Sequence, residues 1–253
     1  MLADERVGIR RNARSAIVTG GASGIGKATC EVLARDGYRV AVFDRDELGA
    51  RAVADAIGGF AFACDVTDER AVASAVERAV ETLGEPLDAL ATPAGIVDTT
   101  PFMELDAAAF LRVYEVNVIG TFLCIREAAR HMQHGSRICT VSSVAGKRGG
   151  GLHGTAAYAA SKGAVIALTR SAARSLAERG IAVNGIVPGP VLTPMLQSSI
   201  DDETKRAHIE GTTLLGRAAE PIEIAEAIAW LLSPAASYVN GEMLSVDGGL
   251  LLD

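Results

Sequence analysis

Aromatic residues make up only 4% of this 253-residue chain, and acidic residues outnumber basic ones by 31 to 24. The formal net charge of −7 opposes binding to a phosphate backbone, and the few aromatic rings leave little to stack on bases. The sequence therefore predicts no nucleic-acid partner.

The chain also lacks paired cysteines and long uninterrupted hydrophobic runs. Its cysteines show no CxxC pairing and no histidine at a metal-site spacing, so we expect buried thiols in a reducing compartment and no metal site. They are Cys30, Cys64, Cys124 and Cys139. The longest uncharged stretch, residues 181–200, contains three prolines and two glycines, which excludes it as a membrane span. Residues 1–14 lack the apolar run of a secretory signal and are expected to form a flexible tail. We expect a cytoplasmic protein with no membrane partner.

Apolar residues are abundant, at 49%, and they follow two alternating patterns. Short, almost continuously apolar runs predict strands buried on both faces. They span residues 15–20, 38–44, 60–66, 87–92, 136–143, 181–189 and 242–249. Helical patterns lie between them, such as residues 68–83 with an apolar stripe and a last helix that begins at Glu220-Pro221. The alternation predicts a three-layer α/β fold, a parallel sheet with helices on both faces, in one domain over residues 15–253.

Residues 191–220 interrupt this alternation with a proline-rich start and a polar, irregularly helical segment. A long excursion from the end of a strand is either a lid over a ligand site or a plain surface insertion. We expect a substrate lid, and the surface insertion is the alternative.

A glycine-rich loop, TGGASGIG at residues 19–26, joins the first strand to the first helix. Gly20, Gly24 and Gly26 would let the backbone approach a pyrophosphate at the positive end of the helix dipole. A tight strand-to-helix turn without a ligand is the alternative. Asp44 ends the second strand, where a carboxylate would accept hydrogen bonds from ribose hydroxyls and repel a 2′-phosphate. Arg45 follows and would offset part of that repulsion, yet the position of Asp44 favours NAD over NADP.

The other strands also end in small or polar residues. Because the carboxyl ends of parallel strands form the ligand crevice of an open sheet, these residues are expected at the same site. They are Asp65 and Val66, Ala94 and Gly95, Ser142 and Ser143, and Pro188 and Gly189. Asp65 could instead begin a helical cap.

Tyr158 and Lys162 are spaced four residues apart in a helical pattern, which places both side chains on one face. A neighbouring ammonium favours the phenolate and lowers the pKa of the tyrosine, so that Tyr158 can accept a proton from an alcohol or donate one to a carbonyl. A chance pair on a helix surface is the alternative.

Together these motifs resemble those of the short-chain dehydrogenase/reductases. The resemblance rests on TGGASGIG at 19–26, Ser143, Tyr158-x-x-x-Lys162, VPGPVLTPM at 187–195 and VDGG at 246–249, in the order of the family, from about Ser15 to the C-terminus. It implies a Rossmann fold with a seven-stranded parallel sheet, a nicotinamide cofactor and hydride transfer.

The resemblance also implies roles for single residues. Tyr158 would be the acid/base, with Lys162 lowering its pKa and binding the nicotinamide ribose. Ser143 would hydrogen-bond the substrate oxygen, with Ser142 as the competing serine, and Asn117 would hold a water that connects Lys162 to solvent. Beyond the residues named above, the cofactor would contact Ser23, Ile25, Val191 through its backbone, and Thr193 through its hydroxyl.

Two features depart from the family pattern. Thr92-Pro93 replaces the usual Asn-Asn before Ala94-Gly95, so the hydrogen bonds of that asparagine are lost. The interval between Ser143 and Tyr158 is about two residues longer than usual, and its glycine-rich loop is expected to bulge toward the substrate. His153 in this loop either contacts the substrate or is an inert exposed histidine, and the second interpretation is favoured.

We therefore expect an NAD-dependent dehydrogenase that interconverts a hydrophobic, cyclic or aromatic secondary alcohol and its ketone. The expected pocket wall is apolar and consists of Ile96, Val97, the Gly149–His153 loop, Val191, Leu192, Met195, Leu196, Leu214 and Leu215. A 3-oxoacyl-carrier-protein reductase and a nucleotide-binding protein without turnover are the alternatives. By resemblance, a homotetramer is expected, with the long helices near 104–132 and 155–179 packing across subunits.

Overall fold

A computed structural model describes residues 14–84, 86–150, 156–197, 201 and 203–252. Seven parallel strands form one sheet in the order β3-β2-β1-β4-β5-β6-β7. The strands are β1 (Ser15–Thr19), β2 (Arg39–Asp44), β3 (Phe60–Ala63), β4 (Leu87–Thr92), β5 (Met132–Val141), β6 (Ala182–Pro188) and β7 (Met243–Val246). The strands and the parallel sheet predicted from the sequence are confirmed.

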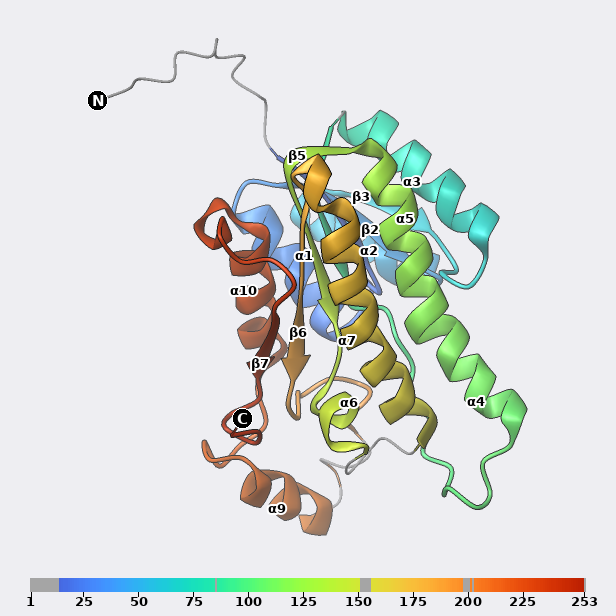
Figure 1. Ribbon diagram of the computed structural model, residues 1–253, viewed down its shortest axis with the longest axis vertical. Coiled ribbons are helices and arrows are strands. Elements are labelled where there is room, and N and C mark those ends of the chain that lie inside the picture. The colour runs from blue at the N-terminus through green and yellow to red at the C-terminus, as the bar shows by residue number, and fades with distance from the viewer. Residues whose placement is uncertain (1–13, 85, 151–155, 198–200, 202, 253) are drawn as a thin grey trace.

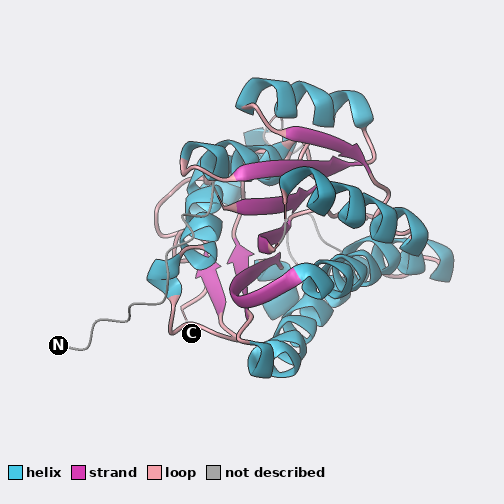
Figure 2. Ribbon diagram, turned by 90° about the horizontal axis from the view of Figure 1, so that it is seen from above, coloured by secondary structure: helices cyan, strands magenta, loops and turns pink. Residues whose placement is uncertain are grey.

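Helices cover both faces of the sheet, which gives the predicted three layers (Figure 2). On one face lie α1 (Gly24–Arg35), α2 (Glu47–Ile57) and α10 (Pro221–Leu232). On the other lie α3 (Glu69–Leu83), α5 (Thr121–His131) and α7 (Ala156–Leu176). Alternate residues of one strand serve the two faces: Ile17 packs with the second group of helices and Val18 with the first, and neither side chain is exposed. Strands in this position must be apolar throughout, as the sequence pattern indicated.

Helix boundaries follow from local capping. Glu220 and Glu223 form a reciprocal capping box at the start of α10, with Pro221 in the first turn, as the sequence predicted. The side chain of Asp68 accepts hydrogen bonds from the amides of Arg70 and Ala71 and caps α3. The alternative of Asp65 as a helix cap is therefore wrong, because Asp65 lies three residues before that cap.

The carboxyl ends of the strands meet at one edge of the sheet. β1 lies between β2 and β4, so the chain winds away from it in opposite directions and leaves a crevice at this point. Just beyond this edge lie α6 (Val144–Arg148) and α9 (Glu203–Thr212), as Figure 1 shows. The fold thus places the glycine-rich loop, the later strand ends and these two helices at one end of the molecule.

The polar excursion at 191–220 returns to the point where it began. An isolated bridge joins Val191 to Ala219, and the amide of Leu192 donates to the Ala219 carbonyl. Helix α9 packs through Ile209 against Leu196 and Ala218, in a small apolar cluster separate from the main core.

Residues 107–131 form one long helical segment made of α4 (Ala107–Tyr114), a π-helical turn η1 (Glu115–Gly120) and α5. Among the described residues it is the one segment long and apolar enough to cross a membrane, by length and composition only, and 44% of its 18-residue apolar stretch is buried within the structure. It packs along α3, α7 and the sheet, as a core helix does. Short 3₁₀ turns, η2 (Ala177–Arg179) and η3 (Pro234–Ala236), complete the described elements.

The four cysteines and the N-terminal segment have separate outcomes. All four thiols are free and buried, as expected. Residues 1–13 lie outside the described part, but Arg14, which was expected in the flexible tail, is held in place. Its carbonyl accepts a hydrogen bond from the amide of Arg39, and its guanidinium lies 4.2 Å from the centre of the Tyr38 ring. The ordered chain therefore begins at least one residue earlier than predicted.

Candidate active site

Two adjoining cavities open at the carboxyl edge of the sheet, with volumes of about 410 and 400 Å³. The first, which we call the tyrosine cavity, contains Ser143, Tyr158 and Lys162 in its wall. The second, the aspartate cavity, contains Asp44 and the glycine-rich loop. The residues common to both walls are Ile25, Pro93, Gly95, Thr193 and Met195. One elongated ligand can therefore extend from one cavity into the other.

Every cofactor residue predicted from the sequence lines one of these cavities. The aspartate cavity takes Gly20, Ser23, Gly24, Ile25, Gly26, Asp44, Asp65, Val66, Ala94, Gly95 and Thr193. The tyrosine cavity takes Tyr158, Lys162, Pro188, Gly189 and Val191, together with Ile25, Gly95 and Thr193 again. The structure thus brings together residues from five strand ends and from α7 that are far apart in the sequence.

The glycine-rich loop has the shape that close backbone approach requires. Gly20 and Gly24 have positive φ angles of 62° and 52°, which favour glycine. A Cβ atom on Gly20 would lie 2.8 Å from the Cα of Ala94, so a side chain there would push the loop away from β4. Ser23 begins α1 without a side-chain capping bond, which leaves the first amides of the helix available to an anion. This end of α1 fits the diphosphate of a dinucleotide.

Asp44 and Asp65 face the aspartate cavity with different local bonds. The carboxylate of Asp44 accepts hydrogen bonds from the amides of Ala22 (3.1 Å) and Asp46 (3.0 Å), which fixes its position beside the loop. The carboxylate of Asp65 accepts from the amide and hydroxyl of Thr67, and these bonds hold its pKa below the usual range. Arg45 and Arg112 contribute to the same lowering. Arg112 comes from α4 and was not anticipated, because the sequence does not show that α4 reaches this cavity.

Tyr158 and Ser143 lie on adjacent helices and interact. Ser143 begins α6 and accepts a hydrogen bond from the amide of Ala145 at 3.2 Å. A hydrogen bond with Ser143 lowers the pKa of the Tyr158 phenol, but burial has the larger effect and raises it above its usual range. The phenol is therefore neutral in the structure. A neutral phenol beside a serine hydroxyl can donate a proton to a carbonyl oxygen.

Lys162 differs from the sequence expectation. Its Nζ atom donates to the carbonyl of Val141 at 2.9 Å and lies 5.7 Å from the centre of the Tyr158 ring. Burial lowers the pKa of Lys162 to about 8. The net shift of the Tyr158 pKa is upward, opposite to the lowering expected from this ammonium, because burial has the largest effect.

Asn117 lines neither cavity and lies behind Gly95. Its amide oxygen accepts from the amide of Ile96 at 2.8 Å, and its amide nitrogen donates to the Ile96 carbonyl and to the Ser161 hydroxyl, both at 2.9 Å. Asn117 lies in the π-helical turn η1, a distortion that often marks functional sites. The side chain therefore fixes the loop after β4, and its role in holding a water stays a prediction.

The two candidate serines are distinguished by their hydrogen bonds. Ser142 donates its hydroxyl to the carbonyl of Lys162 at 2.7 Å and is buried in this bond. Ser143 lines the tyrosine cavity, where its oxygen accepts from the amide of Ala145 and its hydroxyl forms a hydrogen bond with Tyr158. This arrangement favours Ser143 as the serine that contacts a substrate.

The Thr92-Pro93 departure has a visible consequence. The Thr92 hydroxyl is buried and has no hydrogen-bond partner among the residues that the structure describes, and Pro93 contributes to the walls of both cavities. The polar groups of an asparagine are thus replaced by an apolar ring at the junction of the two cavities.

The wall of the tyrosine cavity agrees with the expected residues in part. Val97, Gly150, Val191, Met195 and Leu196 line it as expected, and Ile96 lines the aspartate cavity. Leu192, Leu214 and Leu215 line neither, and they are 37%, 73% and 68% exposed. His153 and the rest of residues 151–155 lie outside the described residues. His208, Ile209 and Thr212 also line it and belong to the 191–220 segment that was expected as the substrate lid, whereas Arg148 and Leu250 were not anticipated.

Known proteins resemble the chain over nearly its whole length. Residues 20–251 match the family model described as enoyl-(acyl carrier protein) reductase. The chain is 40% identical over 243 residues to the 2,5-dichloro-2,5-cyclohexadiene-1,4-diol dehydrogenase of Sphingobium indicum, covering 93% of this chain and 96% of that protein. It is 43% identical over 244 residues to the cis-4-hydroxycyclohexanecarboxylate dehydrogenase of Sinomonas cyclohexanicum, with coverage of 93% and 96%.

A solved structure has the same fold. The dehydrogenase/reductase of Sinorhizobium meliloti 1021 superposes with a TM-score of 0.88 at 36% identity, over 94% of this chain and 95% of that one. The motifs, the strand order and these relatives agree. The chain therefore belongs to the short-chain dehydrogenase/reductase family and is a nicotinamide-dependent oxidoreductase that acts on CH–OH groups.

Proposed function

We propose that the protein is an NAD-preferring dehydrogenase that interconverts a cyclic, hydrophobic secondary alcohol and its ketone. The observation that carries this proposal is the tyrosine cavity, where Ser143 and Tyr158 share a wall with the apolar side chains of Val97, Val191 and Leu196. Two relatives are named for the dehydrogenation of six-membered-ring alcohols, which supports a ring-shaped substrate.

The residues of the chain divide the chemistry between them. Ser143 donates a hydrogen bond from its hydroxyl to the substrate oxygen and orients this oxygen toward Tyr158. In ketone reduction the neutral Tyr158 phenol gives its proton to the carbonyl oxygen; in alcohol oxidation the Oη atom takes the hydroxyl proton. The bound nicotinamide supplies or accepts the hydride at the carbinol carbon. Lys162 and Asn117 hold the ribose side of the site and the loop after β4.

The preference for NAD rests on Asp44. Its carboxylate is fixed by two backbone amides in the aspartate cavity, where it would pair with ribose hydroxyls and repel a 2′-phosphate. Arg45 and Arg112 line the same cavity and weaken this repulsion. A higher kcat/KM with NADP than with NAD would contradict the assignment.

We also propose that residues 191–220 are the substrate lid of a single domain. Met195, Leu196, His208, Ile209 and Thr212 from this segment line the tyrosine cavity. Because the lid has its own small apolar cluster, it can move as a unit over the bound substrate.

A Tyr158→Phe variant tests the function. We expect NAD-linked oxidation of cyclohexanol to fall at least about a hundredfold, because the ring stays but the proton acceptor is lost. Tyr238→Phe, whose ring is fully exposed at the surface, is the matched control and keeps its activity. Turnover that survives Tyr158→Phe undiminished would refute the acid/base role.

Reduction of a 3-oxoacyl group on a carrier protein is the second candidate, because the matching family model is described for an acyl-carrier-protein reductase. It predicts faster turnover of acetoacetyl-carrier protein with NADPH than of any ring ketone with NADH. The Asp44 carboxylate in the aspartate cavity disfavours NADPH, and this favours the ring-alcohol function.

A homo-oligomer is proposed from the surface of the long helical segment. Leu111, Ile119 and Phe122 on residues 107–131 are 58%, 43% and 41% exposed. Apolar side chains repeated along one helix are typical of a covered interface. A tetramer built on this segment and on α7 agrees with the family.

A further inference from the structure

The tyrosine cavity carries a charge asymmetry that an apolar ring alone does not explain. Two cationic side chains line it, Lys162 in its depth and Arg148 at the end of α6, and none of the described lining residues is Asp or Glu. This distribution contrasts with a chain whose net charge is −7 and with the adjoining cavity, which contains Asp44, Asp46 and Asp65.

Arg148 is placed by the same short helix as the substrate-binding serine. Ser143 begins α6 and Arg148 is its last residue, so one rigid turn-and-a-half of helix fixes the separation between the two side chains. The preceding residue, Lys147, points elsewhere: its Nζ atom donates to the Ser245 hydroxyl at 3.2 Å, and it does not line the cavity. Of the two successive cations, only Arg148 faces the substrate space.

The guanidinium of Arg148 is available to a ligand. Among the residues that the structure describes, no carboxylate forms an ion pair with it, although the arginines on neighbouring surfaces, such as Arg217, are paired. An arginine at the mouth of an apolar pocket can bind a carboxylate through two parallel hydrogen bonds. His208 from α9 lines the same cavity and offers a further hydrogen-bonding group from the lid.

We propose that the substrate is a ring alcohol that carries an anionic group, a carboxylate, on the side of the ring away from the reacting carbon, and that Arg148 binds this group. The inference rests on the proposed function and specifies its substrate class. The reacting hydroxyl is held by Ser143 and Tyr158, the ring contacts Val191 and Ile209, and the carboxylate reaches Arg148. The hydride and the proton follow the path already given, so the carboxylate takes no part in the chemistry.

The test compares two ring alcohols that differ in charge. Initial rates are measured with NAD for 4-hydroxycyclohexanecarboxylate and for neutral 4-methylcyclohexanol. For the wild type we expect a higher kcat/KM for the carboxylate. Arg148→Gln should lower kcat/KM for the carboxylate about tenfold, mainly through KM, because one charge-assisted contact is lost. It should change the value for the neutral alcohol less than about twofold.

Two further variants separate a direct contact from general electrostatics. Lys147→Gln removes the same charge from the same helix outside the cavity and should leave both substrates unaffected. Arg148→Lys keeps the charge but loses the two-pronged contact, and should recover part of the carboxylate preference.

The outcomes distinguish this inference from the function on which it rests. Equal kcat/KM for the two alcohols in the wild type, or an equal loss for both in Arg148→Gln, would overturn the carboxylate site and leave the ring-alcohol function intact. No NAD-linked turnover of either alcohol would overturn both.

Discussion

At the scale of single residues, Lys162 shows that the catalytic cavity keeps a cation where burial opposes it. Its pKa of about 8 in the folded protein lies below the ordinary value of 10.5, so the unfolded chain binds this proton more tightly. The buried lysine therefore lowers the free energy of unfolding by its full amount below pH 8, and this destabilising effect disappears as the pH rises toward 10.5. A functional group that destabilises its own fold is common in active sites.

Lys162→Met should therefore stabilise the protein while abolishing turnover. We expect its melting temperature to exceed that of the wild type at about pH 7, and this advantage to shrink at about pH 9.5, because the wild-type lysine then becomes neutral. Lys27→Met, at a half-exposed surface lysine of α1, is the control and should show no such dependence on pH. An advantage of Lys162→Met that grows with pH would contradict the assigned direction of the pKa shift.

Asp44 is the residue on which the proposed preference for NAD rests. Asp44→Asn should lower kcat/KM with NAD and reduce the NAD-to-NADP ratio about tenfold, because a neutral amide no longer repels a 2′-phosphate. Rates with both cofactors measure this ratio. Asp55→Asn, on the exposed side of α2, should leave the ratio unchanged; an unchanged ratio in Asp44→Asn would remove the basis for NAD preference.

The raised pKa of Tyr158 predicts how the rates of oxidation and reduction depend on pH. Burial raises its pKa, and alcohol oxidation needs the deprotonated form, so kcat for oxidation should rise with pH while ketone reduction should fall. Steady-state rates in both directions over the stable pH range check this. Parallel profiles for oxidation and reduction would contradict the role of the phenol.

At the scale of elements, the contact between α6 and α7 positions Ser143 against Tyr158. Gly146 makes this contact possible, since a Cβ atom there would lie 2.6 Å from the carbonyl carbon of Lys162. The backbone of α7 cannot move aside cheaply, so the two helices must separate if a side chain is added.

Gly146→Ala should therefore lower kcat at least about tenfold and cost about 1–3 kcal/mol of stability, with little change in NAD affinity. Kinetics, NAD titration and urea unfolding measure the three effects. Gly211→Ala on α9, where a Cβ atom would meet no other atom within 4 Å, is the control. Wild-type kcat in Gly146→Ala would show that the helix contact does not position the serine.

The strands, and the edge of the sheet at which the site lies, were predictable because both depend on local sequence patterns. Two-face burial requires apolar runs, and each strand end carries a short polar or small residue that the sequence displays. The orientation of helices was not predictable: nothing in the sequence shows that Arg112 of α4 reaches the aspartate cavity or that Arg148 reaches the tyrosine cavity. The pKa of Tyr158 was also misjudged, because spacing along a helix reveals the neighbour but not its burial.

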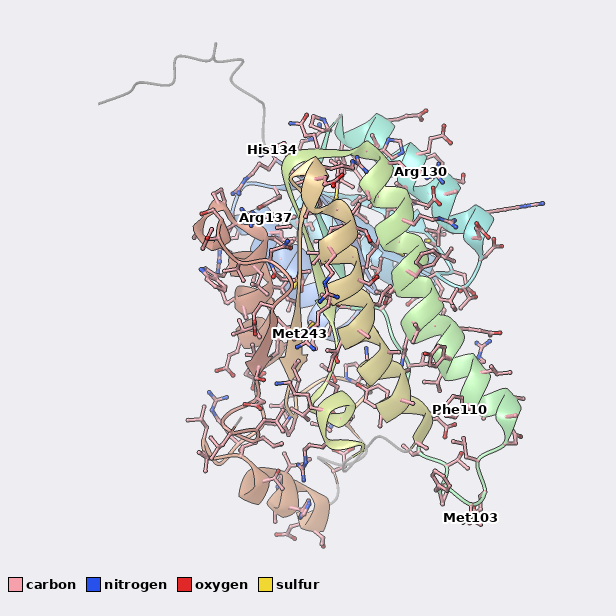
Figure 3. All side chains as sticks on the ribbon, viewed as in Figure 1. Met103, Phe110, Arg130, His134, Arg137 and Met243 are labelled. Atoms are coloured by element: carbon pink, nitrogen blue, oxygen red, sulfur yellow. The ribbon has the colours of Figure 1, made fainter. Side chains whose placement is uncertain are left out.

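At the scale of the whole molecule, the exposed apolar side chains of residues 107–131 are the basis of the proposed homo-oligomer. Figure 3 shows Met103 at the loop before α4 and Phe110 on that helix, at the same side of the molecule. Met103 is 91% exposed and Leu111 58% exposed. Isolated subunits would expose this apolar surface to water, and burying it in an assembly would lower the free energy.

If the proposed homo-oligomer forms through this surface, Leu111→Asp should shift it to smaller species, because a carboxylate cannot be buried unpaired in an apolar interface. Light scattering of the purified chain measures the mass. Leu48→Asp, at an 80% exposed leucine of α2, should leave the assembly intact. A wild-type chain that is monomeric at all concentrations would contradict the proposed interface.

The central claim is that this cavity oxidises ring alcohols with NAD, and one measurement tests it most directly. Purified wild-type protein is mixed with NAD and a series of cyclic and acyclic secondary alcohols, and the appearance of NADH absorbance is followed. The account predicts turnover that is fastest with six-membered-ring alcohols and higher kcat/KM with NAD than with NADP. No NADH formation from any ring alcohol, under conditions where the protein is folded and binds NAD, would contradict it.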